Sequence, residues 1–168
     1  MRPELIANRL QPTADVPTSA RNWSDAVLDY AEALTATLFV NGVPTPPAPV
    51  PAVPGAFRPA REAFFTAMLG VLGTPGTAEV FCQKFEAAYN TFLLAGAPLA
   101  WPGFNAGFAP VPATLTMRLL PAFAKNMTAT DIQEANMNTA RAIDGYTKKI
   151  VWNPVGAPPV VNSMVLVA

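Results

Sequence analysis

The chain has 168 residues, with 11 basic and 11 acidic side chains, no histidine, one cysteine and 19 prolines. Charged residues make up 13% of the sequence and apolar residues 51%, which argues against disorder throughout, because disordered chains combine low hydrophobicity with high net charge. A net charge of zero gives no electrostatic basis for binding nucleic acid or an anionic membrane, and the absence of histidine removes the usual general base and the commonest zinc ligand. Low charge also promotes association, so the composition favours a protein that buries surface against other proteins.

The first expected elements are two helices separated by a linker. Proline suits a first helical turn, so a short helix is expected over Pro3–Leu10. The segment Gln11–Ser19 contains two prolines and is expected to be a linker. Between positions 23 and 38 apolar residues recur at three- and four-residue steps, which predicts an amphipathic helix that Asn22 caps and Gly42 closes.

The polar face of this second helix carries three carboxylates. Paired carboxylates can bind a cation or perform acid–base chemistry. Charged residues at helical spacing equally keep an exposed face solvated, and we favour this interpretation for Asp25, Asp29 and Glu32.

Residues 43–56 are the strongest low-complexity feature of the sequence. Their closely spaced prolines prevent a helix and favour extended polyproline II, which at ~3.1 Å per residue spans roughly 30–40 Å. We expect this proline-rich strap to connect two helices as a semi-rigid link. The alternative is a ligand for the aromatic groove of a proline-recognition domain, although no Arg or Lys flanks the prolines closely.

The next two helices are expected to form an antiparallel hairpin. One starts near Pro59 and ends at Gly73, and the other is capped by Thr74, with Pro75 in its first turn, and closes at Gly96. The turn between them is short, so the two helices are expected to pack side by side. Their phenylalanines would supply much of the core, at about 1.5–3 kcal/mol for each buried ring.

The aromatic loop 97–112 is rich in glycine and proline and carries Trp101, Phe104 and Phe108. Such a loop lies across the core as a lid, offers an apolar surface to another protein, or supplies rings on which a sugar or base stacks. No basic residue falls between Lys84 and Arg118, which argues against a nucleic-acid groove.

Two more helices are expected before the C-terminal segment. One begins at Ala113, and Pro121 is expected to kink or end it. The other begins at Thr128, which resembles part of a capping box with Asp131, and ends at Gly145.

The C-terminal segment changes character, because residues 148–154 and 160–168 are β-prone and are separated by prolines and a glycine. An apolar β-prone segment does not stay unpaired in water. It either pairs with Ile150–Trp152 of the same chain or adds a strand to a neighbouring subunit.

The expected fold class is therefore mainly α, a small helical bundle of about five or six helices with extended proline-rich loops and a β-prone C-terminal arm. The expected organisation is an N-terminal segment over 1–19, a helical domain over 20–146 that contains the proline-rich strap and the aromatic loop, and an extended arm over 147–168.

Motifs that carry chemistry are absent from the sequence. It contains no glycine-rich phosphate loop, no nucleophile elbow and no cysteine or histidine set at metal-ligand spacing. Cys82 lies in a helical apolar pattern, which is typical of a buried, inert thiol. We therefore expect a protein that is not an enzyme, with no catalytic residue, no cofactor and no metal. A small glycan hydrolase with two carboxylates is the enzymatic alternative, because such partners meet only in the fold.

Several short motifs together resemble a known group of proteins. They are Trp23-Ser24-Asp25-Ala26 with Tyr30, Gly42-Val43-Pro44, Phe85 with Tyr89-Asn90-Thr91-Phe92, and Ala100-Trp101-Pro102-Gly103. Over most of residues 20–145 the chain resembles the small alanine- and proline-rich virion structural proteins of tailed bacteriophages. The resemblance implies a neck, tail or baseplate component in the virion, assembled in the host cytoplasm, that contacts other virion proteins and copies of itself and has no catalytic residues.

The sequence thus predicts a non-enzymatic structural subunit of a tailed-phage-like particle, with protein partners and neither nucleic acid nor membrane as a partner. Aromatic residues dominate the binding energy of interfaces, and an extended arm adds apolar interface area with few residues. The expected interface residues are Trp101, Phe104, Phe108, Trp152, Val160, Val161, Val165, Leu166 and Val167. The main alternative is a stand-alone protein-binding module that uses the proline-rich strap or the aromatic loop.

Overall fold

The structure is a computed structural model that describes residues 3–13, 15–40, 43–102, 106–108, 114–154 and 163–167. Over these ranges the chain forms six helices and six short strands. The helices are α1 (Pro3–Ala7), α2 (Val16–Glu32), α3 (Arg58–Gly73), α4 (Ala78–Ala100), α5 (Leu115–Asn126) and α6 (Ile132–Thr147). The strands are β1 (Thr35–Val40), β2 (Val43–Pro44), β3 (Val50–Pro51), β4 (Ala106–Phe108), β5 (Val151–Pro154) and β6 (Ser163–Val167). The prediction of a mainly helical bundle is confirmed.

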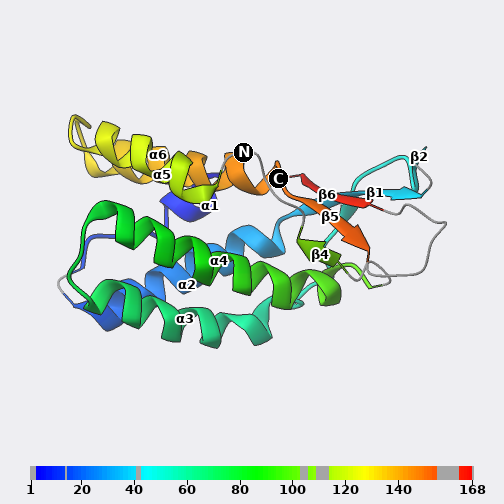
Figure 1. Ribbon diagram of the computed structural model, residues 1–168, viewed down its shortest axis with the longest axis horizontal. Coiled ribbons are helices and arrows are strands. Elements are labelled where there is room, and N and C mark those ends of the chain that lie inside the picture. The colour runs from blue at the N-terminus through cyan, green and yellow to red at the C-terminus, as the bar shows by residue number, and fades with distance from the viewer. Residues whose placement is uncertain are drawn as a thin grey trace.

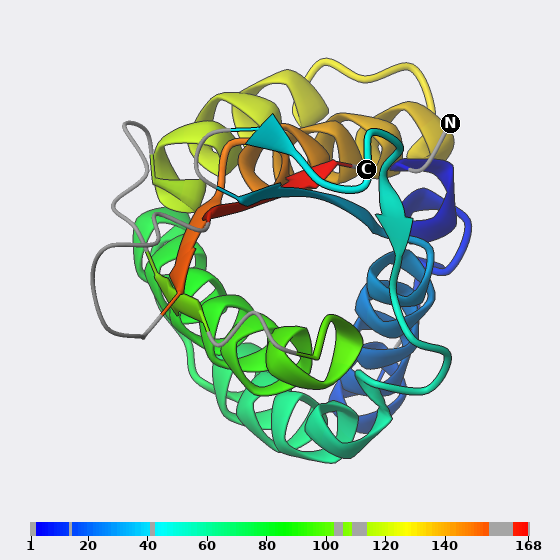
Figure 2. The same ribbon diagram turned by 90° about the vertical axis from the view of Figure 1, so that its right-hand side faces the viewer.

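The helices surround one core, and the sheet closes one end of the molecule (Figure 1). α5 and α6 lie on one side and α3 on the opposite side, with α2 and α4 between them, as the view along the long axis in Figure 2 also shows. All six helices contribute buried apolar side chains to this core. Even the short α1 does so, because its Ile6 is fully buried.

The strands form one sheet in the order β2-β1-β6-β5-β4, with β3 also paired to β1, and every pairing is antiparallel. β6 lies between β1 and β5. Leu38 is opposite Met164 in the first pairing, and Val151 is opposite Val165 in the second. The C-terminal segment therefore pairs within its own chain, with the expected 151–152 region and with β1.

The helix expected to extend to Gly42 ends at Glu32, and residues 35–40 form β1 instead, so this part of the prediction is wrong. Gly42 lies outside the described residues. The stretch is rich in β-branched and aromatic residues, which favour a strand. Ala36 and Leu38 are buried while their neighbours are half-buried, so the apolar positions follow the period of a strand. The pairing partner β6 is remote in sequence, so the local pattern did not distinguish a helix from a strand over residues 35–40.

The expected linker Gln11–Ser19 is shorter than predicted, because α2 begins at Val16. The helix is capped by Asp15 and not by Asn22. The Asp15 carboxylate accepts a hydrogen bond from the Thr18 N–H at 2.8 Å. A proline in the first turn is compatible with this start, since a first-turn N–H has no helical partner.

The proline-rich strap 43–56 folds back along β1, with which β2 and β3 both pair. Its end is bound to the residue before β1 and to the last residue of α4, since the Ala52 N–H donates to the Leu34 carbonyl at 3.1 Å and the Val53 N–H donates to the Ala100 carbonyl at 3.0 Å. The expectation of a free-standing spacer between two helices is therefore wrong, because the strap follows β1 and gains backbone hydrogen bonds by running antiparallel along that strand.

α3 and α4 form the expected antiparallel hairpin, but the limits of α4 differ from the prediction. Thr77 caps α4, its hydroxyl accepting from the Val80 N–H at 3.3 Å, so Thr74 is not the cap. α4 also continues through Gly96 and Pro98 to Ala100, so the first residues of the predicted aromatic loop are helical.

Gly96 lies inside α4 because the ring of Phe57 fills the space that a side chain would take. Phe57 is fully buried, stacks on Phe92 with ring centroids 5.4 Å apart, and meets Trp101 edge-on at 6.2 Å. This close approach fixes the end of α4 against the start of α3.

The limits of the last two helices also depart from expectation. Pro121 lies inside α5 and does not end it. α6 is capped by Asp131, whose carboxylate accepts from the Glu134 N–H at 2.8 Å, and not by Thr128. α6 continues past Gly145, because helical glycine costs only about 1 kcal/mol and tertiary packing overrides it.

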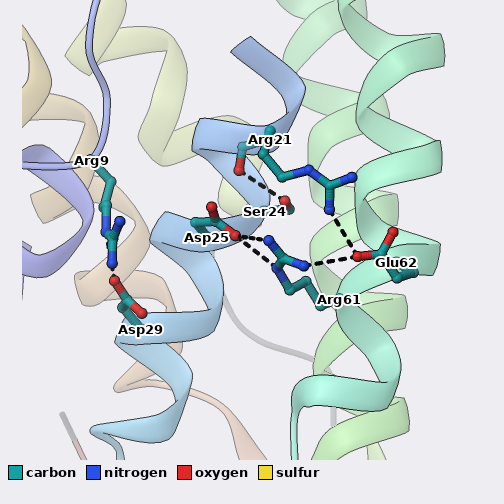
Figure 3. A network of polar contacts seen from close by, with 7 residues as sticks. All are labelled: Arg9, Arg21, Ser24, Asp25, Asp29, Arg61 and Glu62. Carbon is teal, nitrogen blue, oxygen red and sulfur yellow. Dashed lines mark hydrogen bonds and ion pairs between the residues drawn. The ribbon is translucent and has the colours of Figure 1, made fainter. Parts of the chain in front are cut away.

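A seam of ion pairs joins α2 to α3 (Figure 3). Arg61 of α3 donates from Nε to the Asp25 carboxylate of α2 at 2.7 Å. Arg61 and Arg21 both donate to the Glu62 carboxylate at 2.8 Å. Two further pairs on the polar face of α2 are Arg9–Asp29 and Arg58–Glu32. The three α2 carboxylates are thus engaged with arginines of neighbouring segments.

We predict that Gly96→Ala destabilises the fold by about 1–3 kcal/mol, because the added methyl group would overlap the Phe57 ring and force a core aromatic to move. Gly70→Ala is the matched control, since nothing lies within 4 Å of its added methyl group and alanine is the better helix former by about 1 kcal/mol. Urea unfolding followed by circular dichroism measures both. A native-like midpoint for Gly96→Ala would contradict this packing.

Candidate functional site

Trp101 belongs to the core of this chain and is not presented to a partner. Its side chain is 2% exposed, and its indole N–H donates to the Val50 carbonyl at 3.0 Å. Of the three roles considered for the aromatic loop, the structure places this ring as a lid over the end of the core. The prediction that Trp101 anchors an interface is therefore corrected, because its ring is buried within the chain.

The remaining predicted interface residues lie in strands or outside the description. Phe108 of β4 is opposite Trp152 of β5 in the register of that pairing. The backbone of residues 165–167, Val165, Leu166 and Val167, pairs with β1. Phe104, Val160 and Val161 lie outside the described residues. The structure thus brings the predicted segments together in one sheet, and their role in an interface stays a prediction.

A buried cluster of hydroxyl groups joins α2 and α4 to α6. The Tyr30 hydroxyl donates to the Asp144 carboxylate at 2.9 Å, and Lys148 Nζ lies 2.6 Å from the other carboxylate oxygen. The hydroxyls of Tyr89 and Thr147 are 2.7 Å apart. Burial raises the pKa of Tyr30 and of Tyr89 well above the usual value, so both phenols are neutral. These groups satisfy one another, and the cluster is a structural connection.

The described ranges contain no group of three or more His, Cys, Asp and Glu residues that could hold a metal ion. Cys82 is fully buried, and burial raises the pKa of its thiol, which keeps it protonated and unreactive. Among the helices of the described part, none is both long and apolar enough to cross a membrane.

An apolar groove lies on the outer face of the α3–α4 hairpin, with a volume of about 570 Å³. Phe64 and Phe92 form its buried floor, with their ring centroids 5.6 Å apart. Lys84 is the only charged residue among the described residues that line it. The other lining residues are Ala60, Ala63, Ala67, Gly70, Val71, Thr74, Ala87, Ala88, Thr91 and Ala95. We call this surface the hairpin groove.

The spacing of small residues explains why the hairpin groove forms. On α3 they stand at positions 60, 63, 67 and 70, with 74 just after its end, and on α4 at 87, 88, 91 and 95, so each set follows one helix face. Three aromatic side chains of the hairpin, Phe64, Phe85 and Phe92, are almost fully buried in the core. Leu94 of α4, which is 41% exposed, directly precedes the groove residue Ala95 in the sequence.

Sequence reasoning missed the hairpin groove because alanine counts as apolar on either face of a helix. Ala67 and Ala88, for example, are only half-buried and both line the groove. The recurrence of alanine, glycine and threonine at three- and four-residue steps is the signal that identifies the face.

No protein-family model, no curated protein and no solved structure matches the chain. The function is therefore inferred from the geometry of the described residues.

We predict that the folded chain releases no phenolic proton near the usual tyrosine pKa of about 10. All three tyrosines are buried, and burial raises the pKa of Tyr146 to about 12 and those of the other two beyond their usual range. The unfolded chain releases these protons at lower pH, so stability falls as the pH rises from about 10 to 12. Ultraviolet titration of phenolate in the folded chain, with the urea-unfolded chain as control, tests this. A tyrosine with an ordinary titration in the folded chain would refute the arrangement of the buried cluster.

Proposed function

We propose that the chain is a non-enzymatic structural subunit that associates with a second copy of itself through the hairpin groove and so contributes to a larger protein particle. The observation that carries the proposal is the groove itself, an apolar surface of small side chains on two adjacent helices. Large exposed apolar surfaces of soluble proteins usually mark interaction sites. Small residues also let the backbones of facing helices approach closely, as in tightly packed helix pairs.

The charge of the chain and of the groove favours a second copy of the chain as the partner that binds the hairpin groove. The net charge of the chain is zero, so two copies do not repel each other over a long range. Among the described residues lining the groove, only Lys84 is charged, and its long side chain can keep its ammonium group at the rim. Contact across a two-fold axis thus removes apolar surface from water without burying an acidic group.

The size of the surface also fits such a contact. α3 has 16 residues and α4 has 23, which correspond to lengths of about 24 and 35 Å. Two adjacent helices are roughly 20 Å wide, so the shared face covers on the order of 500 Å² in each copy. Two copies together reach about 1,000 Å², the lower limit for a specific interface.

Self-association through the hairpin groove does not depend on the C-terminal arm. β6 already pairs with β1 on one side and with β5 on the other, so its backbone is used within the chain. Association through the hairpin groove does not require this strand to leave its sheet. The resemblance to virion structural proteins of tailed phages supports a particle with several protein components, in which other surfaces contact the remaining partners.

We predict that Ala87→Glu weakens self-association at least tenfold (roughly 1.4 kcal/mol or more), because it places a carboxylate, which must lose its hydration, in an apolar contact. Ala87 is exposed on α4, so the substitution leaves the fold intact, and circular dichroism verifies this. Ala124→Glu, on an exposed position of α5 away from the groove, is the matched control. Sedimentation velocity over a range of concentrations measures the dissociation constant of each variant.

The expected result is reversible dimerisation of the native chain and of Ala124→Glu, and a shift to monomer for Ala87→Glu. A native chain that stays monomeric at all concentrations would overturn self-association and favour the stand-alone binding module. Equal dimerisation of all three proteins would move the interface away from the hairpin groove.

A further inference from the structure

Three cations of α5 and α6 have no ion-pair partner among the described residues. They are Arg118, Lys125 and Arg141. Most other described cations do pair with carboxylates, and these are Arg9, Arg21, Arg58, Arg61 and Lys148. The charges of the chain balance in number but are not distributed evenly.

The carboxylates of the same two helices are already engaged elsewhere. Asp131 accepts the capping hydrogen bond from the Glu134 N–H at 2.8 Å, and the Glu134 carboxylate accepts from the Thr130 N–H at 2.8 Å. Asp144 binds the Tyr30 hydroxyl and Lys148 in the buried cluster. None of these acids neutralises the three cations.

The three cations line one groove between α5 and α6, with a volume of about 370 Å³. The lining residues are Arg118, Pro121, Ala122 and Lys125 of α5 and Asn138, Arg141 and Ala142 of α6. No Asp or Glu is among the described residues that line it. We call this surface the basic groove.

Two contacts fix the register of the helices and place the cations at neighbouring levels. The Asn126 amide donates to the Thr139 hydroxyl at 3.1 Å, and Arg118 Nη1 lies 3.4 Å from the position of a methyl group on Gly145. In this antiparallel register Arg141 stands between the levels of Arg118 and Lys125. At about 1.5 Å per residue these levels span roughly 10 Å, which long side chains bridge when they converge on one anion.

Arg118 is held in place by the fold. It is half-buried, and its Nε atom is inaccessible to solvent and has no hydrogen-bond partner. Its guanidinium lies against Gly145, where the missing side chain leaves it room. A buried donor without a partner is costly in free energy. A bound anion would offset part of this cost by making charge-assisted hydrogen bonds with the guanidinium of Arg118.

We propose that the basic groove binds a phosphate group, either as the free ion or as a phosphomonoester. Three cations without a counter-charge match a phosphate, which carries about −1.5 to −2 at neutral pH, better than a single carboxylate. Arginine also presents a planar fork of donors that suits phosphate oxygens, and the Asn138 amide adds a neutral donor. The groove lies on α5 and α6, away from the hairpin groove, so this proposal is independent of self-association (Figures 1 and 2).

The test is a nuclear magnetic resonance titration of the full-length chain with inorganic phosphate, glycerol 3-phosphate and acetate at constant ionic strength. We expect shifts confined to α5 and α6 for both phosphates and much weaker binding of acetate. Tighter binding of glycerol 3-phosphate identifies an ester as the ligand, and equal binding identifies the free ion. Acetate binding as strong as phosphate binding would overturn the proposal.

Arg141→Gln is the principal variant, because Arg141 is exposed and its substitution spares the core. It is expected to weaken phosphate binding about tenfold, since it removes one charge-assisted contact. Lys149→Gln is the matched control, since Lys149 is an exposed cation outside both grooves that has no ion pair in the described part of the chain, and it is expected to leave phosphate binding unchanged. Equal effects of the two variants, or no shifts in α5 and α6, would show that no such site exists.

Discussion

The close packing of Phe57 on Gly96 is the contact on which the arrangement of the molecule depends. Because position 96 has no side chain, the Phe57 ring brings the start of α3 onto the end of α4 and stacks on Phe92. The same ring meets Trp101, whose indole N–H binds the carbonyl of Val50 in β3. One aromatic contact therefore sets the hairpin geometry and also connects the helices to the sheet that closes the core.

The hairpin groove is a consequence of this packing. Phe64 and Phe92 are buried between the two helices, most residues above them are alanine, glycine or threonine, and a hollow remains there. The charges lie elsewhere. On the α2–α3 seam arginines and carboxylates pair with one another, whereas the α5–α6 surface keeps three cations without partners. A neutral chain thus presents an apolar surface on one pair of helices and a basic one on another.

The sequence predicted well what local patterns determine. The helix predicted from about Pro59 to Gly73 agrees with α3, and the hairpin was predicted from the short turn that follows it. The strand over 35–40 was missed, since its pairing partner β6 stands at the other end of the chain. The basic groove was missed for a similar reason. Arg118, Lys125 and Arg141 are dispersed in a chain of zero net charge, and only the antiparallel packing of α5 on α6 brings them together.

Cross-linking at position 87 tests self-association through the hairpin groove most directly. The only native cysteine, Cys82, is fully buried, so Ala87→Cys adds a single reactive thiol to the groove. A short bifunctional maleimide is expected to convert Ala87→Cys into a covalent dimer and to leave the native chain and Ala124→Cys monomeric. An Ala87→Cys protein that cross-links no better than Ala124→Cys would contradict association through this face.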